Sequence, residues 1–149
     1  MKNILNLDLV AQIGIVVSNI EKACNEFSKI FGLEKPDIII TDVYEKSKTE
    51  YKGEPTYARA KLAFFHLKNI VIEFIEPDEN PSTWREFLDN YGEGIHHLGF
   101  EIKGMKEILK NFEDLGIQVV QRGEYEGGRY AYMDTLNSLK FIIELLEND

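Results

Sequence analysis

Four apolar, strand-like segments of the sequence each place one polar side chain at a corresponding position. Side chains alternate between the two faces of a strand, and the more apolar face of each segment is the one expected to lie beneath a helix. The opposite face then carries a side chain able to bind a metal ion or a proton; these residues are Gln12, Glu73, His97 and Glu144. If the segments curl into one cup, the four side chains can converge inside it.

Together these side chains have the chemistry of a divalent metal site. An imidazole, two carboxylates and an amide each carry a donor lone pair at neutral pH, and the two carboxylates would balance the charge of one M²⁺. An oxygen-rich set favours Mn, Mg, Co or Ni over a thiolate-type Zn site, and open coordination positions would accept water or two substrate oxygens. Taken singly, a strand glutamate is usually a solvated edge residue and a strand histidine a structural one.

Hydrophobic periodicity predicts the elements that must position these residues, in an order that occurs twice. Polar residues 45–56 predict a mobile loop, and residues 137–138 predict a hairpin turn. The expected strands are 11–17, 37–41, 58–67, 70–76, 95–102, 117–121, 130–135 and 139–147, and the expected helices are 20–31, 81–92 and 105–115.

An internal repeat links the two halves of the chain. An offset of 85 residues maps Gln12 onto His97 and Gly14 onto Gly99. A repeat at this period indicates a duplicated structural unit. We therefore expect an α+β protein whose two βαβββ modules form an open, cup-shaped mixed sheet with helices outside. The chain is expected to be a single domain over 1–149, with modules at about 9–77 and 95–147 and a connecting helix at about 81–92.

Composition narrows the classes of partner. The net charge of −9 disfavours nucleic-acid binding, and it also disfavours an anionic substrate such as a coenzyme A (CoA) ester unless a local basic rim exists. No apolar run reaches the roughly 18 residues of a membrane span. The N-terminal residues lack the pattern of a signal peptide, and the single Cys24 permits no internal disulfide. A cytoplasmic protein with a small-molecule substrate is expected, and neither nucleic acid nor membrane as partner.

Several motifs resemble those of the vicinal oxygen chelate superfamily, which includes glyoxalases, bleomycin-resistance proteins and methylmalonyl-CoA epimerases. Residues 94–101 (GIHHLGFE) resemble the opening of the second module of the epimerases. Residues 12–17 (QIGIVV), with Phe31-Gly32-Leu33 after a helix, resemble the first-module opening of the superfamily. Residues 72–77 (IEFIEP) and 143–147 (IELLE) resemble its acidic strand ends. The resemblance extends from about Leu9 to Glu147.

The resemblance implies a metal ion held by Gln12, Glu73, His97 and Glu144, with Co, Ni, Mn, Mg or Zn as candidates. It also implies catalysis through Glu144. The expected function is that of a metal-dependent isomerase or lyase, acting through an enolate on a small carbonyl or acyl-CoA substrate as methylmalonyl-CoA epimerases do. Lactoylglutathione lyase is the nearest enzyme alternative. Because Gln12 replaces the usual His, the second alternative is a metal-free binding protein of the drug-sequestering type.

Three further expectations concern the surroundings of this site. The glycines at 127 and 128 permit close backbone approach, so Arg129 and Tyr132 are expected to bind substrate at a pocket mouth; simple sheet packing is the alternative. Alternation places His96 on the face opposite His97, in a structural role.

Open sheet edges invite pairing, and together with the resemblance they indicate a homodimer.

Overall fold

Strands from both halves of the chain join one mixed sheet. The computed structural model describes residues 5–149. Its strands are β1 (Val10–Val16), β2 (Ile39–Ile40), β3 (Glu50–Tyr51), β4 (Glu54–Pro55), β5 (Ala60–His66), β6 (Val71–Pro77), β7 (Gly94–Glu101), β8 (Val119–Tyr125), β9 (Gly128–Met133) and β10 (Ile142–Asn148). Its helices are α1 (Ile20–Phe31), α2 (Tyr44–Ser47), α3 (Thr83–Tyr91), α4 (Met105–Asp114) and α5 (Leu136–Leu139).

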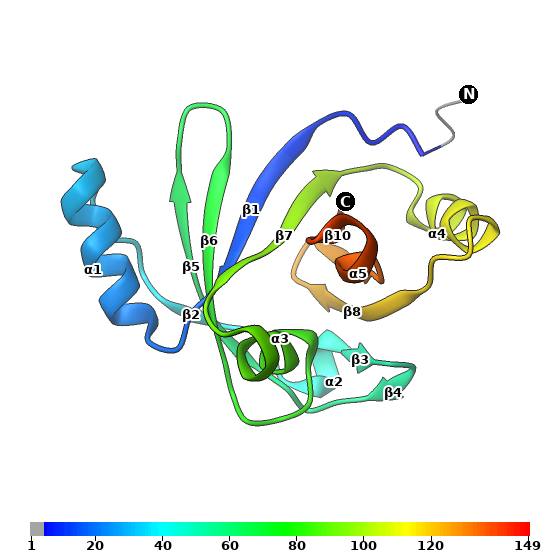
Figure 1. The fold of residues 1–149 in the computed structure, drawn as a ribbon, viewed down its shortest axis with the longest axis horizontal. Helices are drawn as coiled ribbons and strands as arrows, with labels where there is room; N and C mark the ends of the chain where they lie inside the picture. Colours follow the sequence, from blue (N-terminus) through cyan, green and yellow to red (C-terminus); the bar gives the residue numbers. More distant parts are fainter. Residues whose placement is uncertain (1–4) are drawn as a thin grey trace.

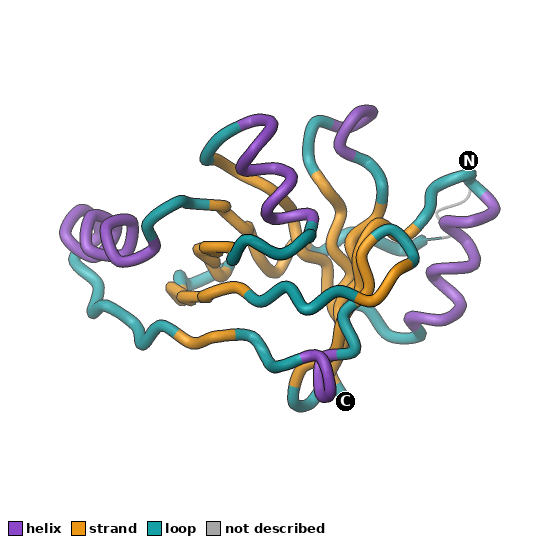
Figure 2. Tube along the Cα trace, turned by 90° about the horizontal axis from the view of Figure 1, so that it is seen from below, coloured by secondary structure: helices purple, strands orange, loops and turns teal. Residues whose placement is uncertain are grey.

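The sheet is curled, and its strand order reflects the internal repeat. The order is β2-β5-β6-β1-β7-β10-β9-β8-β3-β4, so β1 and β7, the first strands of the two modules, lie side by side at the centre. Figure 1 shows the resulting cup, with α1 and α4 at opposite ends of the molecule, and the view from below in Figure 2 places the strands between these helices. The predicted α+β architecture of paired βαβββ modules is confirmed.

Each long helix covers the outer, apolar face of its own module. Asn19 caps α1 by accepting a hydrogen bond from the Lys22 N–H at 3.1 Å, and Gly32 ends the helix with a left-handed φ of 66°. Two apolar clusters hold the helices on the sheet. The cluster at α1 consists of Val17, Ile20, Cys24, Ala63, Phe65 and Phe74. The cluster at α4 consists of Ile102, Met105, Phe112, Ala131, Met133, Ile143 and Leu145.

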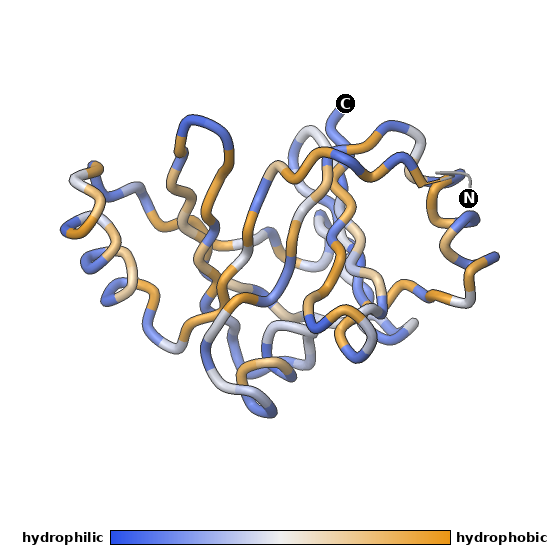
Figure 3. Tube along the Cα trace, turned by 45° about the horizontal axis from the view of Figure 1, so that its top comes forward, coloured by the Kyte–Doolittle hydropathy of each residue, from blue (hydrophilic) through white to orange (hydrophobic). Residues whose placement is uncertain are grey.

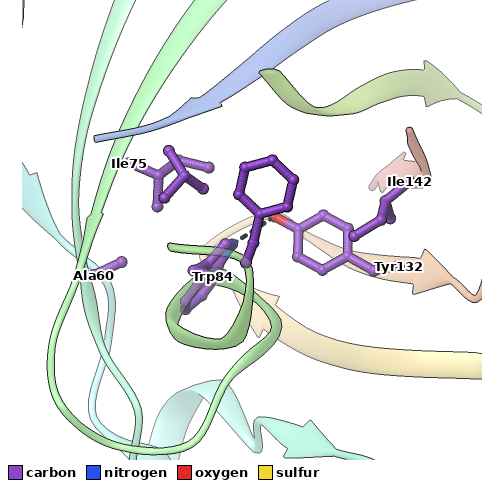
Figure 4. Packing of buried hydrophobic residues seen from close by; sticks show 7 residues of the cluster. Ala60, Ile75, Trp84, Tyr132 and Ile142 are labelled. Atoms are coloured by element: carbon purple, nitrogen blue, oxygen red, sulfur yellow. Dashed lines mark hydrogen bonds between the residues drawn. The ribbon is translucent and has the colours of Figure 1, made fainter. Parts of the chain in front are cut away.

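A third cluster joins the two modules beneath α3. Ser82 caps this helix by accepting from the Arg85 N–H at 3.0 Å. The cluster consists of Val16, Ala60, Ile75, Trp84, Phe87, Tyr132 and Ile142. Figure 4 shows Trp84 and Tyr132 converging from α3 and β9, where the indole N–H donates to the Tyr132 hydroxyl at 3.0 Å. Packing across this seam fixes the two halves of the cup relative to each other.

Two segments differ from the expectations. Residues 45–56, predicted as a mobile loop, contain most of α2 and all of β3 and β4. Here β3 pairs with β8 of the second module, and the Lys52 N–H donates to the Val120 carbonyl at 2.8 Å, so non-local contacts order the segment. The expected turn at 137–138 is the short helix α5.

Figure 3 shows that the turn between β5 and β6 is hydrophilic, whereas hydrophobic stretches follow the adjoining strands. No helix within residues 5–149 is long and apolar enough to cross a membrane.

Candidate functional site

Two glycines organise the four residues singled out in the sequence. Gly14 on β1 is paired with Glu73 on β6 and with His97 on β7. Gly99 on β7 is paired with Gln12 on β1 and with Glu144 on β10. The two modules therefore present equivalent sets, each with one glycine between two polar residues, and they meet at the seam of the cup.

The missing side chains at these glycines make room for the cluster. A Cβ built on Gly14 would overlap the His97 imidazole and would lie 2.5 Å from its Nδ1. A Cβ on Gly99 would lie 2.7 Å from Oε1 of Glu144. Neither glycine has a positive φ, so the requirement for glycine here is steric. The strands accommodate the imidazole and the carboxylate only because their neighbours carry no side chain.

The structure brings Glu73, His97 and Glu144 together. Nε2 of His97 lies 3.3 Å from Oε1 of Glu73 and 3.2 Å from Oε1 of Glu144. All three side chains are buried. None of these three atoms makes a hydrogen bond of good geometry within residues 5–149, so their orientation toward one another is not explained by hydrogen bonding alone. Three convergent, unsatisfied polar atoms are rare in a buried site.

Electrostatics favour a proton on this cluster. Burial alone would lower the pKa of His97, but the carboxylates of Glu144 and Glu73 outweigh it and raise that pKa to about 10. Burial raises the pKa of Glu73, an effect opposed by its contact with His97. At neutral pH the cluster therefore shares a proton held mainly on the imidazole. Such a site can take up or release a proton, or exchange it for a metal ion.

His96 departs from the position predicted by strand alternation. The pairing of β1 with β7 advances from Gly14–His97 to Ile15–Ile95, so His96 is the additional residue of a β-bulge. A bulge redirects side chains, and both imidazoles are consequently buried, with their Nδ1 atoms 2.8 Å apart. Nε2 of His96 lies 3.1 Å from Oγ1 of Thr83. One Nδ1 must donate to the other, and this bond fixes the orientation of His97.

The cluster lies at the inner face of a cavity of about 530 Å³. Gln12, Glu73 and Glu144 line it, and so does the predicted substrate-binding residue Tyr132. His97 is fully buried behind the two carboxylates. The walls are largely apolar or aromatic, and they include Ile39, Ile40, Leu62, Phe64, Val71, Trp84, Tyr130 and Leu146. Such a cavity suits a small molecule with an apolar body and few polar groups.

Arg129 does not reach this cavity. It alternates with Tyr130 and Tyr132 along β9 and therefore points to the other face of the sheet. There its guanidinium donates to Glu147 at 2.7 Å and also to Asp149. Its expected role at the pocket mouth is corrected to one of anchoring the C-terminal strand.

Aromatic side chains from α3 and β9 also line the cavity. Trp84 lines the cavity and also packs in the cluster that joins the two modules. Tyr130 lines it as well, and its hydroxyl accepts from the Gln121 amide at 3.0 Å. The Gln121 oxygen in turn accepts from the Thr83 N–H at 2.8 Å. Alternation along β9 pairs Tyr130 with Tyr132 on one face, and this signal was present in the sequence.

The chemical types of the four side chains suit a divalent metal ion. One imidazole nitrogen, two carboxylates and the amide of Gln12 match the preference of hard and borderline divalent ions for O and N ligands, and the unsatisfied atoms point toward one another. Their spacing, however, is that of side chains that share a proton. Within residues 5–149, no group of three or more His, Cys, Asp or Glu side chains has the geometry of a metal site. Binding would require loss of the proton on His97 and a small outward movement of the carboxylates.

Comparisons with known proteins agree with the fold. Residues 11–132 match the model of the Glyoxalase/Bleomycin resistance protein/Dioxygenase superfamily. The uncharacterized protein YqjC of Bacillus subtilis strain 168 is 25% identical over 138 residues, covering 91% of this chain and 89% of that protein.

Solved structures with the same fold include epimerases. Methylmalonyl-CoA epimerase from Mycobacterium tuberculosis has a TM-score of 0.62 at 19% identity, over 100% of this chain and 93% of the other. A Streptomyces coelicolor methylmalonyl-CoA epimerase variant in complex with 2-nitronate-propionyl-CoA has a TM-score of 0.65 at 18% identity, over 96% and 99%. At these identities the similarity establishes the fold.

Proposed function

The chain belongs to the Glyoxalase/Bleomycin resistance protein/Dioxygenase superfamily, and on that premise we propose that it is a metal-assisted isomerase or lyase that moves a proton next to a carbonyl group. The proposed substrate is a small carbonyl compound or thioester whose apolar part fills the cavity. The proposed site is the cluster of Gln12, Glu73, His97 and Glu144.

One observation carries this proposal. Nε2 of His97 and one oxygen each of Glu73 and Glu144 converge within 3.2–3.3 Å, buried and without well-formed hydrogen bonds. A purely structural ion pair would be expected to satisfy these atoms, since unsatisfied buried polar groups destabilise the fold. Buried groups beside a cavity whose pKa values are shifted, such as His97 and Glu73, are typical of functional sites.

The side chains can be assigned roles from their positions. Glu144 would take the proton from the carbon next to the carbonyl, because its carboxylate is buried yet lines the cavity. Glu73 occupies the other side of His97, so it could return a proton to the opposite face of the substrate. Trp84 and Tyr132 would hold the apolar part and exclude water. A divalent ion bound by Gln12, Glu73, His97 and Glu144 would polarise the carbonyl and acidify the adjacent C–H.

A solvent-exchange experiment tests the proposal directly. Purified protein, as isolated and after loading with Co²⁺, Ni²⁺, Mn²⁺, Mg²⁺ or Zn²⁺, is incubated in D₂O with a panel of small carbonyl compounds and acyl thioesters. Deuterium entering the position next to the carbonyl, detected by mass spectrometry, supports the proposed reaction. Elemental analysis of the same preparations identifies any resident ion. A complete lack of exchange with every ion and compound would refute proton transfer at this site.

Metal binding should depend steeply on pH. Because the pKa of His97 is raised to about 10, the imidazole is protonated at neutral pH and must lose that proton to bind an ion. Each Co²⁺ should therefore release about one proton, and its association constant should rise by about tenfold per pH unit between roughly pH 7 and 9. Calorimetry in buffers of different ionisation enthalpy measures both quantities. An affinity independent of pH would exclude His97 as a ligand.

A metal-free binding protein remains the second candidate function, because the His97 proton already neutralises part of the charge of Glu73 and Glu144. Replacing Gln12 separates the two candidates. If the site binds metal, Gln12→His supplies a better nitrogen donor and should tighten Co²⁺ binding at least about tenfold. Gln118→His, at an exposed position outside the cavity, is the matched control.

Calorimetric titration of the three proteins with Co²⁺ gives the result. Wild-type binding tighter than about 10 μM, roughly −7 kcal/mol, would support the metal-assisted reaction. The metal-free function is favoured if neither wild type nor Gln12→His binds Co²⁺ detectably; Gln118→His shows whether an added surface histidine alone changes the affinity. In that case the same polar side chains would serve to orient a bound small molecule.

We also propose that the protein forms a homodimer. The edge strand β2 leaves Ile39 and Ile40 about half exposed, at 50% and 55%, and unprotected apolar edges favour pairing with another chain. Light scattering at micromolar concentration is expected to give twice the mass of one chain, and Ile39→Lys with Ile40→Lys to shift it toward the monomer. A wild-type monomer over this range would contradict the proposal.

A further inference from the structure

The mouth of the cavity carries negative charge without any compensating positive charge. Six carboxylates line the cavity: Glu73 and Glu144 in its depth, and Asp42, Glu101, Glu124 and Glu126 nearer the solvent. No Lys or Arg of the described residues lines it. This local excess has the same sign as the net charge of −9, so the cavity lacks the local basic rim that a polyanionic ligand would require.

The four outer carboxylates are not engaged elsewhere. None of them takes part in an ion pair within residues 5–149. Two cations of neighbouring segments have other partners. Lys103 donates to the carbonyl oxygen of Asn148, and Arg129 is held by Glu147 and Asp149 on the other face. Among the described residues, no ion pair neutralises the four carboxylates at the mouth.

The depth of the same cavity points independently to a ligand. Glu144 is only 4% exposed, and its Oε1 has no hydrogen-bond partner of good geometry. The aromatic rings of Trp84, Tyr130 and Tyr132 line the space around it. A ligand for this cavity thus has an apolar body that packs on the rings and a polar group that reaches the buried carboxylates, and it passes four negative charges on entry.

We infer that the cavity selects uncharged or positively charged carbonyl compounds and rejects anionic ones, CoA thioesters included. This selection rests on the proposed function only in placing the ligand in this cavity. Asp42, Glu101, Glu124 and Glu126 are the residues that determine it. A cationic group at the mouth gains attraction to these carboxylates, whereas each phosphate of a CoA ester is repelled by them.

Four butyryl thioesters that differ in charge provide the test. Butyrylthiocholine is cationic, S-butyryl-2-mercaptoethanol is neutral, S-butyryl-3-mercaptopropionate is anionic, and butyryl-CoA is polyanionic. Trp84 is the only tryptophan of the chain and lines the cavity, so its fluorescence reports binding without any need for turnover. Affinity is expected to fall about fivefold with each step from cation to neutral to anion at low salt, and the steps should shrink in about 0.5 M salt.

A charge-matched pair of variants assigns the effect to the mouth. Asp42→Asn, Glu101→Gln, Glu124→Gln and Glu126→Gln together should reduce the cation-to-anion ratio of affinities to about twofold or less. The control variant removes four exposed carboxylates that do not line the cavity, through Glu26→Gln, Glu34→Gln, Glu113→Gln and Asp114→Asn. The control variant makes the same change in net charge as the mouth variant, and it should keep most of the cation-to-anion ratio of affinities.

The outcomes separate this inference from the proposed reaction. Butyryl-CoA binding as tightly as butyrylthiocholine, a control variant that loses the ratio as fully as the mouth variant, or no fluorescence response to any ester would each overturn the selection. The expected order of affinities, found while no compound of the whole panel exchanges deuterium with any ion, would uphold the selection and refute the proposed reaction. Deuterium exchange that is fastest with butyryl-CoA would support the proposed reaction and overturn the selection.

Discussion

Replacing Glu144 with glutamine is expected to lower kcat/KM for the proposed proton transfer by about 10²–10⁴-fold, the range typical of a removed general base. Glutamine has nearly the same shape as glutamate but cannot take up the proton, and it removes one negative charge from the metal ligands. The change is buried beside the cavity, so its effect should fall on the reaction. The rate of deuterium exchange into the best substrate of the panel measures it.

A second readout separates chemistry from folding. Because Glu144 is the main group that raises the pKa of His97, Glu144→Gln should lower this pKa, as NMR titration of the imidazole would record. Glu113→Gln, the same substitution at an exposed position of α4, should leave both the rate and the titration unchanged. Exchange within about threefold of the wild-type rate would exclude Glu144 as the base.

Strand alternation accounts for the part of the site that the sequence could predict. In β1, β6, β7 and β10 one face packs under a helix, so the residues on the other face had to turn into the cup. Because the period is two, this reasoning places Gln12, Glu73 and Glu144 as well as His97 without knowledge of distances. The same rule separates Arg129 from Tyr132, which lie an odd number of residues apart on β9. The two side chains therefore lie on opposite faces of the sheet, and only Tyr132 lines the cavity.

Other features depend on contacts that no periodic pattern encodes. The bulge at His96 is a property of the register between β1 and β7, and register arises only when two distant strands pair. Residues 45–56 are polar, and their order depends on β8, some 70 residues away, through the ion pair between Glu50 and Arg122 at 3.1 Å. The charge of the cavity mouth likewise comes from segments around residues 42, 101 and 124–126 that meet only in the folded chain.

Replacing Gly14 with alanine is expected to destabilise the wild-type fold by about 3 kcal/mol or more, at the upper end of the range for overpacked cores. The new methyl group would overlap the His97 ring, which is fully buried and held by His96. The ring must move, and Nε2 then leaves the two carboxylates. Urea unfolding at pH 7 measures the loss of stability, and Co²⁺ affinity should fall with it.

The clash itself can be isolated by a double-mutant cycle. The atoms that meet the added methyl group belong to the imidazole ring, so His97→Ala removes them while leaving the backbone in place. Gly14 has no positive φ, and alanine there should then be neutral or stabilise by roughly 0.4–1 kcal/mol through the unfolded chain. The coupling between the two substitutions should therefore reach about 3 kcal/mol. Equal costs of Gly14→Ala in both backgrounds would mean that glycine at this position does not serve to seat His97.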